Sequence, residues 1–404
     1  MLSQTFLKLL FITTLIIGLF SCNEKSSQPT PLEYATKMAD SDIQRNPEAW
    51  MLDFMSKPKW NYTNGLECSA LEQLWLETQN DKYFYYVKGY ADSLIDENGI
   101  INNYKLKDYN IDKINPGKFL FLLYEKTGDD RYKKAIDTLR EQMKTHPRTS
   151  EGGFWHKKKY PWQMWLDGLY MGTPFLAQYA YTFHEDSLFD DVALQIHLIN
   201  KYTRDSTTGL YYHGWDESRE QQWANKSTGK SPNIWGRGMG WFAMSLVDVL
   251  EYFPADHPKR PEILEITNQM AQAITKYQDD STGVWYQVVD KGGQEGNYLE
   301  SSASTMFEYF LIKAINNHYI DDSYFKAAQK GYDGIIKQFI KTNADSTISI
   351  TQCCAGAGLG GSPYRDGSYE YYVNEHYRND DPKAIGPFIM MMLEFEKHNK
   401  QTTN

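Results

Sequence analysis

The feature that most constrains this chain is a helical plan repeated along most of its 404 residues. Several segments begin with an aspartate-containing turn and then place apolar residues at helical spacing. They are DKYFYYVKGYADSLI from 81, DDRYKKAIDTLREQM from 129, DSLFDDVALQIHLIN from 186 and DSYFKAAQKGYDGII from 322, while PKRPEILEITNQMAQAI from 258 opens on prolines. Aspartate before a helix and proline in its first turn both favour a helix start. These segments are predicted to be amphipathic outer helices.

More apolar segments lie between the amphipathic ones. They are predicted to form inner helices that begin near Gly65, Asp112, Asp167, Arg237, Glu300 and Ala384. A first helix around residues 35–55 completes six helix pairs. Amphipathic helices outside and apolar helices inside predict an all-α fold, an (α/α)6 barrel that forms one domain over residues 35–404. An open helical solenoid is the alternative. It is disfavoured because the repeat length varies and aromatic-rich loops interrupt it.

Two of these loops have nearly the same sequence. TGLYYHGWD (208–216) and TGVWYQVVD (282–290) each continue from a glycine into alternating large residues. This pattern predicts short β-hairpins that connect an outer helix to the next inner one. All such connections gather on one rim of the barrel, where a cleft can form.

The first residues have the pattern of a targeting signal. Lys8 precedes the apolar run Leu9 to Phe20, which is too short to span a bilayer, and Cys22 and a polar stretch follow. This resembles a bacterial lipoprotein signal over residues 1–22, with Cys22 as the lipidated residue and 23–34 as a linker. A plain secretory peptide is the alternative. We therefore expect a bacterial cell-envelope lipoprotein, periplasmic or in the outer membrane, that contacts the membrane only through its lipid.

Composition and motifs exclude several classes of partner. The net charge is −10 without a basic run, so nucleic acid is a poor partner. Cys68, Cys353 and Cys354 lack the spacing of a zinc site or a disulfide framework, and no cluster of ligands predicts a catalytic metal. The stretch GAGLGG (356–361) matches a dinucleotide fingerprint, but a turn-like segment follows it instead of a helix. We expect no cofactor.

Two acids at predicted inner-helix starts are candidates for catalysis. Asp112 and Asp167 occupy equivalent points of successive helix pairs, so both are expected on the same rim. N-capping is the ordinary role of aspartate there. Trp162, Trp165 and Tyr170 surround Asp167 in the sequence, and aromatic neighbours raise a carboxyl pKa by desolvation, which suits a general acid. Enzymes that hydrolyse carbohydrates commonly use a pair of acids in an aromatic pocket.

Five sequence blocks, in this order, resemble glycoside hydrolase family 105, the unsaturated rhamnogalacturonyl hydrolases, which are related to the unsaturated glucuronyl hydrolases of family 88. The blocks are IDKINPGKFLFLLYEKTGDDRY, WHKKKYPWQMWLDGLYMGTPFLAQY, YYHGWDES, SPNIWGRGMGWFAMSLVDVL and GLGGSPYRDGSYEYY. The resemblance implies an (α/α)6 barrel. It also implies that Asp167 is the catalytic acid/base and Asp112 the second active-site carboxylate. The positions it assigns to the pocket of the unsaturated sugar are His156, Trp165, His213, Arg237 and Trp241.

The implied substrate is a lyase-generated oligosaccharide with a 4,5-unsaturated uronic acid at its non-reducing end. Asp167 protonates C4 of the double bond, and water then adds at C5, with no metal or nucleotide. Rhamnogalacturonan fragments, and hence pectin degradation, are the expected case. Unsaturated glucuronyl ends from ulvan, arabinogalactan or glycosaminoglycan fragments stay open. Two further alternatives are an epimerase or lyase on the same barrel, and a surface lipoprotein that binds glycans without catalysis.

Overall fold

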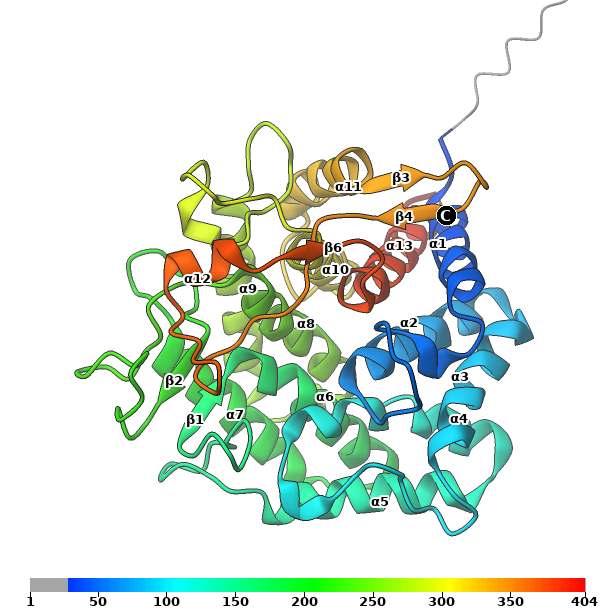
Figure 1. Cartoon of the computed structure of the whole chain (residues 1–404), viewed down its shortest axis with the longest axis horizontal. Coiled ribbons are helices and arrows are strands. Elements are labelled where there is room, and N and C mark those ends of the chain that lie inside the picture. Colours follow the sequence, from blue (N-terminus) through cyan, green and yellow to red (C-terminus); the bar gives the residue numbers. More distant parts are fainter. Residues whose placement is uncertain (1–27, 404) are drawn as a thin grey trace, which may run out of the picture.

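The helices form two concentric layers in a computed structural model that describes residues 28–403 (Figure 1). The inner layer consists of α2 (Tyr62–Thr78), α4 (Leu120–Thr127), α6 (Leu166–Phe183), α8 (Gly236–Tyr252), α10 (Ser301–Asn316) and α13 (Pro382–Thr403). The outer layer consists of α1 (Pro31–Arg45), α3 (Asp81–Leu94), α5 (Asp130–Thr145), α7 (Ser187–Thr203), α9 (Arg260–Lys276) and α11 (Phe325–Phe339). Helices α6, α8, α10, α13 and α2 pack against one another in succession, and the 3-10 turn Asn115–Gly117 before α4 closes the ring between α2 and α6. The described part thus confirms the (α/α)6 barrel.

Side-chain caps explain where several helices begin. Thr30 and Glu33 form a capping box at the start of α1, and Asp129 accepts a hydrogen bond from the backbone N–H of Arg131 in α5. Glu300 accepts hydrogen bonds from two N–H groups in the first turn of α10. The sequence correctly placed the starts of α5 and α10. The first helix, expected around residues 35–55, instead spans Pro31–Arg45.

The second inner helix differs from the prediction. It was expected to begin near Asp112, but two short 3-10 turns, Ile111–Lys113 and Asn115–Gly117, come first and α4 begins only at Leu120. Pro116 lacks an N–H group and disfavours the α conformation at the residue before it. These turns pack tightly on α2, because a Cβ atom added at Gly65 would lie 2.6 Å from Pro116. Asp112 therefore lies on a rim turn outside the helix.

Short antiparallel strand pairs connect segments outside the helices. They are β1 (Gln163–Trp165) with β2 (Gly214–Asp216), β3 (Ile340–Thr342) with β4 (Ile348–Ile350), and β5 (Cys353–Cys354) with β6 (Tyr377–Arg378). The segment 208–216 is extended, but β2 pairs with β1 rather than within its own segment. Likewise, 282–290 makes single bridges to Leu299 and Trp235. The partners lie directly before an inner helix, so these pairings fix the rim segments to the helix starts.

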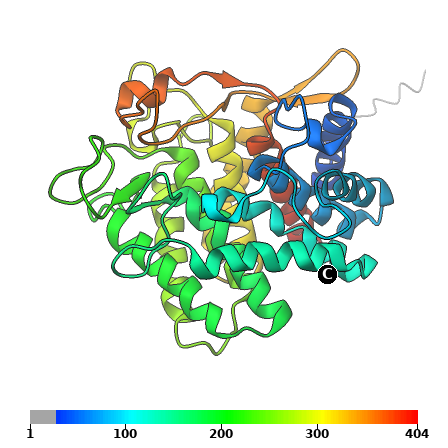
Figure 2. The same cartoon turned by 60° about the horizontal axis from the view of Figure 1, so that its bottom comes forward.

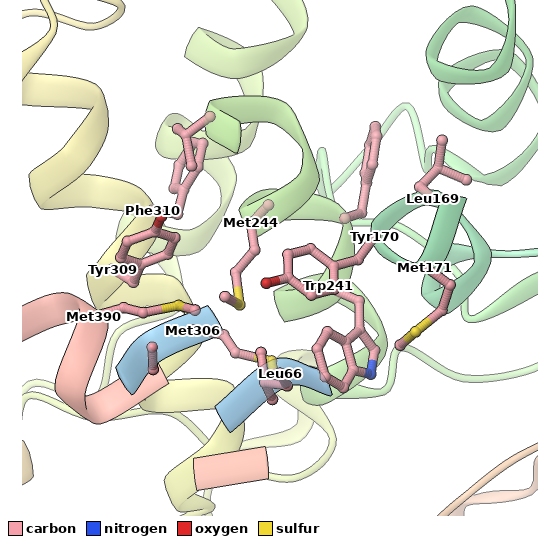
Figure 3. Close-up of a cluster of buried hydrophobic side chains, with 14 of the residues drawn as sticks. Leu66, Leu169, Tyr170, Met171, Trp241, Met244, Met306, Tyr309, Phe310 and Met390 are labelled. Carbon is pink, nitrogen blue, oxygen red and sulfur yellow. The ribbon is translucent and has the colours of Figure 1, made fainter. Parts of the chain in front are cut away.

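Aromatic and methionine side chains fill the middle of the barrel. Tyr170 and Trp241 stack with ring centroids 5.1 Å apart, and Met244, Met306 and Met390 belong to the same cluster of buried side chains (Figure 3). All are buried, so this cluster separates the two ends of the barrel. The cysteines at 68, 353 and 354 are also buried, and none of these three forms a disulfide in the described residues.

The N-terminal signal, with Cys22 and most of the linker, lies outside the described residues. In the part that the structure covers, we find no helix with the length and apolar character needed to cross a membrane.

Candidate active site

Asp167 lies in the first turn of α6, directly after strand β1. Trp165 of β1 pairs with Gly214 of β2, and the N–H of Leu166 donates to the carbonyl of His213 over 3.0 Å. These backbone contacts bring the Asp167 carboxylate to 3.0 Å from His213 Nε2. The N-cap position of α6 is occupied by Trp165. Asp167 is therefore not a capping residue, and its side chain is directed at the imidazole.

His213 lies between Asp167 and a tyrosine from a distant part of the chain. Its Nδ1 is hydrogen-bonded over 2.7 Å to the hydroxyl of Tyr372, which belongs to the short helix α12 (Tyr369–Asn374). Its ring is fully buried and packs against Trp235. In Figure 2 the segment around α12, drawn in orange, lies along one side of the barrel. The Tyr372 contact fixes the orientation of the imidazole, and hence which nitrogen faces Asp167.

The pKa of Asp167 departs from the sequence-based expectation. Burial raises it, as predicted, but the charge and hydrogen bond of His213 outweigh burial and hold the pKa below its ordinary value. The N-terminus of α6 acts in the same direction. The prediction of a net rise is wrong because the sequence did not place His213 beside the carboxylate. Asp167 is ionised in the free protein near neutral pH.

Asp112 has its own set of partners. Lys157 Nζ lies 2.5 Å from its Oδ2, and His156 Nε2 lies 3.3 Å from its Oδ1. Burial raises the pKa of Asp112, but Lys157 and His156 bring it below its ordinary value. The charge of Asp167 acts in the raising direction, so the two carboxylates are close enough to interact. The predicted pair of acids is thus brought together on the rim.

The neutral imidazole of His156 completes this group. Burial lowers its pKa to about 4, despite the opposing effect of Asp112. Its Nδ1 is buried without a hydrogen-bond partner among the described residues. A Cβ atom added at Gly168 would lie 3.2 Å from this nitrogen, so the glycine allows the ring to pack against α6. Trp165 stacks on His156 with ring centroids 4.4 Å apart and also contacts the ring of His213. It therefore forms an aromatic wall between the two histidines.

Among the described residues, Arg237 and Trp241 form no hydrogen bond or ion pair with Asp112 or Asp167. Arg237 is buried, and its Nη1 donates to Ser302 Oγ and to the carbonyl of Cys354. Its guanidinium carbon lies 4.8 Å from the Trp235 ring centroid. Trp241 lies one helical turn deeper, within the central aromatic cluster (Figure 3). Arg237 therefore joins α8, α10 and β5 behind the site, and its Nε has no partner among residues 28–403.

Sequence reasoning missed Lys157 and Tyr372. Lys157 belongs to the run of lysines at 157–159, whose charge alone does not show which one turns inward. Tyr372 is 159 residues from His213 along the chain, and its segment carries no local signal for that contact. Within the described residues, no group of three or more His, Cys, Asp or Glu side chains has a geometry that could hold a metal ion.

Comparison with known proteins gives a consistent result. The family model described as Glycosyl Hydrolase Family 88 matches residues 34–399. A solved glycoside hydrolase of family 105 from C. acetobutylicum is 42% identical, with a TM-score of 0.87 over 90% of this chain and 99% of that one. The unsaturated rhamnogalacturonyl hydrolase YesR of Bacillus subtilis is 26% identical over 67% of this chain and 74% of its own length. The unsaturated glucuronyl hydrolase of Bacillus sp. GL1 is 13% identical, with a TM-score of 0.66 over 91% of this chain and 97% of that one, which shows a shared fold.

Proposed function

Because the chain belongs to glycosyl hydrolase family 88 and is a glycoside hydrolase, we propose that it removes a 4,5-unsaturated uronic acid from the non-reducing end of rhamnogalacturonan-type oligosaccharides. The observation that carries the proposal is the contact of Asp167 with His213 beside a second carboxylate. The likeness to the rhamnogalacturonyl hydrolase of B. subtilis supports the choice of substrate.

In this proposal Asp167 is the proton donor, although it is ionised in the free protein. His213 supplies the missing proton. When His213 is protonated, its Nε2–H faces the carboxylate at 3.0 Å, and a shift of that proton gives a neutral imidazole and a carboxylic acid. The substrate's own carboxylate favours this shift, because a second negative charge nearby raises the pKa of Asp167. The pair thus holds the proton that C4 receives.

The remaining steps use the same carboxylate. Protonation of C4 converts the double bond to a single bond and leaves positive charge shared between C5 and the ring oxygen. The Asp167 carboxylate then accepts a proton from water while the water oxygen bonds to C5. The resulting hemiketal opens without further catalysis, which frees the aglycone sugar and a keto-uronate. One side chain serves as acid and then as base.

The neighbouring groups bind and orient the sugar. Lys157 is the positively charged group beside the two acids, and although it is paired with Asp112 its ammonium has further N–H donors that suit an oxygen of the uronate carboxylate. Asp112 holds Lys157 and lies beside His156, and the Trp165 wall offers an apolar face to the ring. Arg237 acts by fixing the helix starts around Trp235. A lipoprotein that only binds glycans would have no use for the Asp167–His213 pair.

A panel of oligosaccharides tests the choice of substrate. Unsaturated galacturonyl-rhamnose and unsaturated glucuronyl disaccharides are incubated with the protein, and loss of the ultraviolet absorption of the double bond is followed. We expect the highest kcat/KM for the galacturonyl-rhamnose compound. A higher value for a glucuronyl compound would reassign the substrate, and no loss of absorption with any member would overturn the hydration mechanism.

A further inference from the structure

A second cavity lies at the opposite mouth of the barrel. Its volume is about 570 Å³, and its walls come from the later parts of inner helices α2, α6, α8, α10 and α13. On α6 the lining residues are Tyr170, Pro174 and Gln178, whereas Asp167 is in the first turn. At about 1.5 Å per residue, Gln178 lies about 16 Å along the helix from Asp167. The aromatic and methionine cluster of Figure 3 separates the two ends.

The cavity contains a lysine without an anionic partner. Lys118 is only 8% exposed, and its ammonium makes no hydrogen bond or ion pair within residues 28–403. Its one close contact is the face of the Tyr170 ring, whose centroid lies 3.6 Å away. The Tyr170 hydroxyl is itself fully buried without a partner in the described chain. The side-chain nitrogen of Lys118 and the hydroxyl of Tyr170 are thus two hydrogen-bond donors without an acceptor at one end of the cavity. A buried donor without an acceptor lowers the stability of the fold.

Within the described residues, the carboxylates in the same walls form no ion pair with Lys118. Asp248 and Glu251 lie 2.9 Å and 2.8 Å from Lys313 Nζ, which pairs with both. At the cavity rim Glu77 pairs with Lys400 and Glu394 with Lys397. Burial raises the pKa of Glu72 well above its ordinary value, so this group is neutral and is a further donor. Burial lowers the pKa of Lys118 to about 7, although the charge of Asp248 acts in the raising direction. A bound anion would hold this amine in its protonated form.

We propose that this cavity binds a monosaccharide carboxylate of the uronic acid type, with its carboxylate at Lys118 and the Tyr170 hydroxyl. The volume exceeds what a simple anion fills. Ser69, Gln73 and Gln178 supply amide and hydroxyl groups suited to sugar hydroxyls, and Pro174 and Tyr252 supply apolar surface for a ring face. The inference concerns a site remote from Asp167 and does not depend on the proposed hydrolase substrate.

Isothermal titration calorimetry with D-galacturonate tests the proposal directly. Lys118→Met removes the charge and keeps the length of the side chain, and we expect at least a tenfold loss of affinity. Tyr170→Phe keeps the stacking on Trp241, removes one donor and should weaken binding about threefold, on the scale of a single hydrogen bond. Lys326→Met, at an exposed position on outer helix α11, is the matched control and should bind as the wild type does.

Two further ligands separate the parts of the proposal. D-galactose has the ring without the carboxylate, and acetate has the carboxylate without the ring; each should bind at least tenfold more weakly than D-galacturonate. Equal affinity for D-galactose would contradict the role of Lys118, and equal affinity for acetate would contradict a sugar site. Absence of binding to the wild type, or binding that Lys118→Met and Tyr170→Phe leave unchanged, would overturn the proposal. None of these outcomes depends on turnover, so they are distinguishable from a failure of the hydrolase assignment.

Discussion

Asp167 and Asp112 are similarly exposed, with 15% and 14% of the side chain accessible, but their partners differ. Asp112 faces a lysine and a histidine with a lowered pKa, so its negative charge is balanced permanently. Asp167 faces a histidine whose other nitrogen is held by Tyr372. This difference in partners supports our proposal that Asp167 has the acid/base role and Asp112 an orienting role.

We predict that Tyr372→Phe lowers kcat with little change in KM. Loss of the 2.7 Å hydrogen bond frees the orientation of His213, and a bond of this kind contributes about 1 kcal/mol, or roughly fivefold in rate. The pH profile of kcat should shift as well, because the contact with His213 that holds the pKa of Asp167 below its ordinary value is weakened. Tyr371→Phe is the control, because the Tyr371 hydroxyl bonds to the N–H of Gly358 instead. Unchanged kcat and an unchanged pH profile in Tyr372→Phe would contradict the positioning role.

At the scale of elements, helices α10 and α11 pack against each other around the buried side chain of Glu308. Glu308 of α10 is fully buried, and both of its carboxylate oxygens lack a partner in the described structure. A Cβ atom added at Gly331 of α11 would lie 1.9 Å from Glu308 Oε2, so the glycine makes room for the acid. Burial, together with the charge of Asp333, raises the pKa of Glu308 well above its ordinary value of 4.5. Glu308 is therefore protonated in the folded state.

This predicts a pH-dependent stability. The unfolded chain ionises at Glu308 above about pH 4.5 while the folded chain does not, so its contribution to stability is present at lower pH and is lost as pH rises toward the folded pKa. The loss amounts to about 1.4 kcal/mol per pH unit in this window. The melting temperature of Glu308→Gln should equal that of the wild type near pH 4.5 and should exceed it at pH 8. Glu265→Gln on the exposed surface of α9 is the control; an equal difference at both pH values would refute the assignment.

The elements also show what local sequence can and cannot predict. Outer helices were predictable because Asp or Pro at their starts and an apolar stripe are local signals, as at Asp129. The late start of α4 could not be predicted, because apolar residues at helical spacing continue through the turn that contains Pro116. The pairing of β1 with β2 and the contact of Tyr372 with His213 join distant segments. The sign of the Asp167 pKa shift depends on that long-range geometry, so it was missed as well.

For the whole molecule, the barrel has two chemically different ends. The rim formed by helix starts holds paired acids, histidines and Trp165, and the opposite mouth holds Lys118 in a separate cavity. The buried middle does not connect them. The ring of helices positions the acids of the proposed site, and changes at one end are expected to leave the other intact.

The N-terminal segment adds a proposal about location. We propose that Cys22, outside the described residues, carries a lipid that anchors the barrel at the bacterial cell envelope, because an apolar run ends there and a polar stretch follows. Cys22→Ala should move the protein from the membrane fraction to the soluble fraction of fractionated cells. Ser21→Ala keeps the cysteine and should stay with the membrane. A membrane-bound Cys22→Ala protein would disprove lipidation at this residue.

The most direct test of the central claim is the rate at which Asp167→Asn removes the ultraviolet absorption of an unsaturated substrate. Asparagine keeps the size of the side chain and an oxygen that can accept from His213, and Asp167 is not a helix cap, so the melting temperature should stay near that of the wild type. The variant cannot give a proton to C4 or take one from water. We expect a loss of about 3–5 kcal/mol of transition-state stabilisation in kcat/KM. A folded variant that removes the absorption at the wild-type rate would contradict the account.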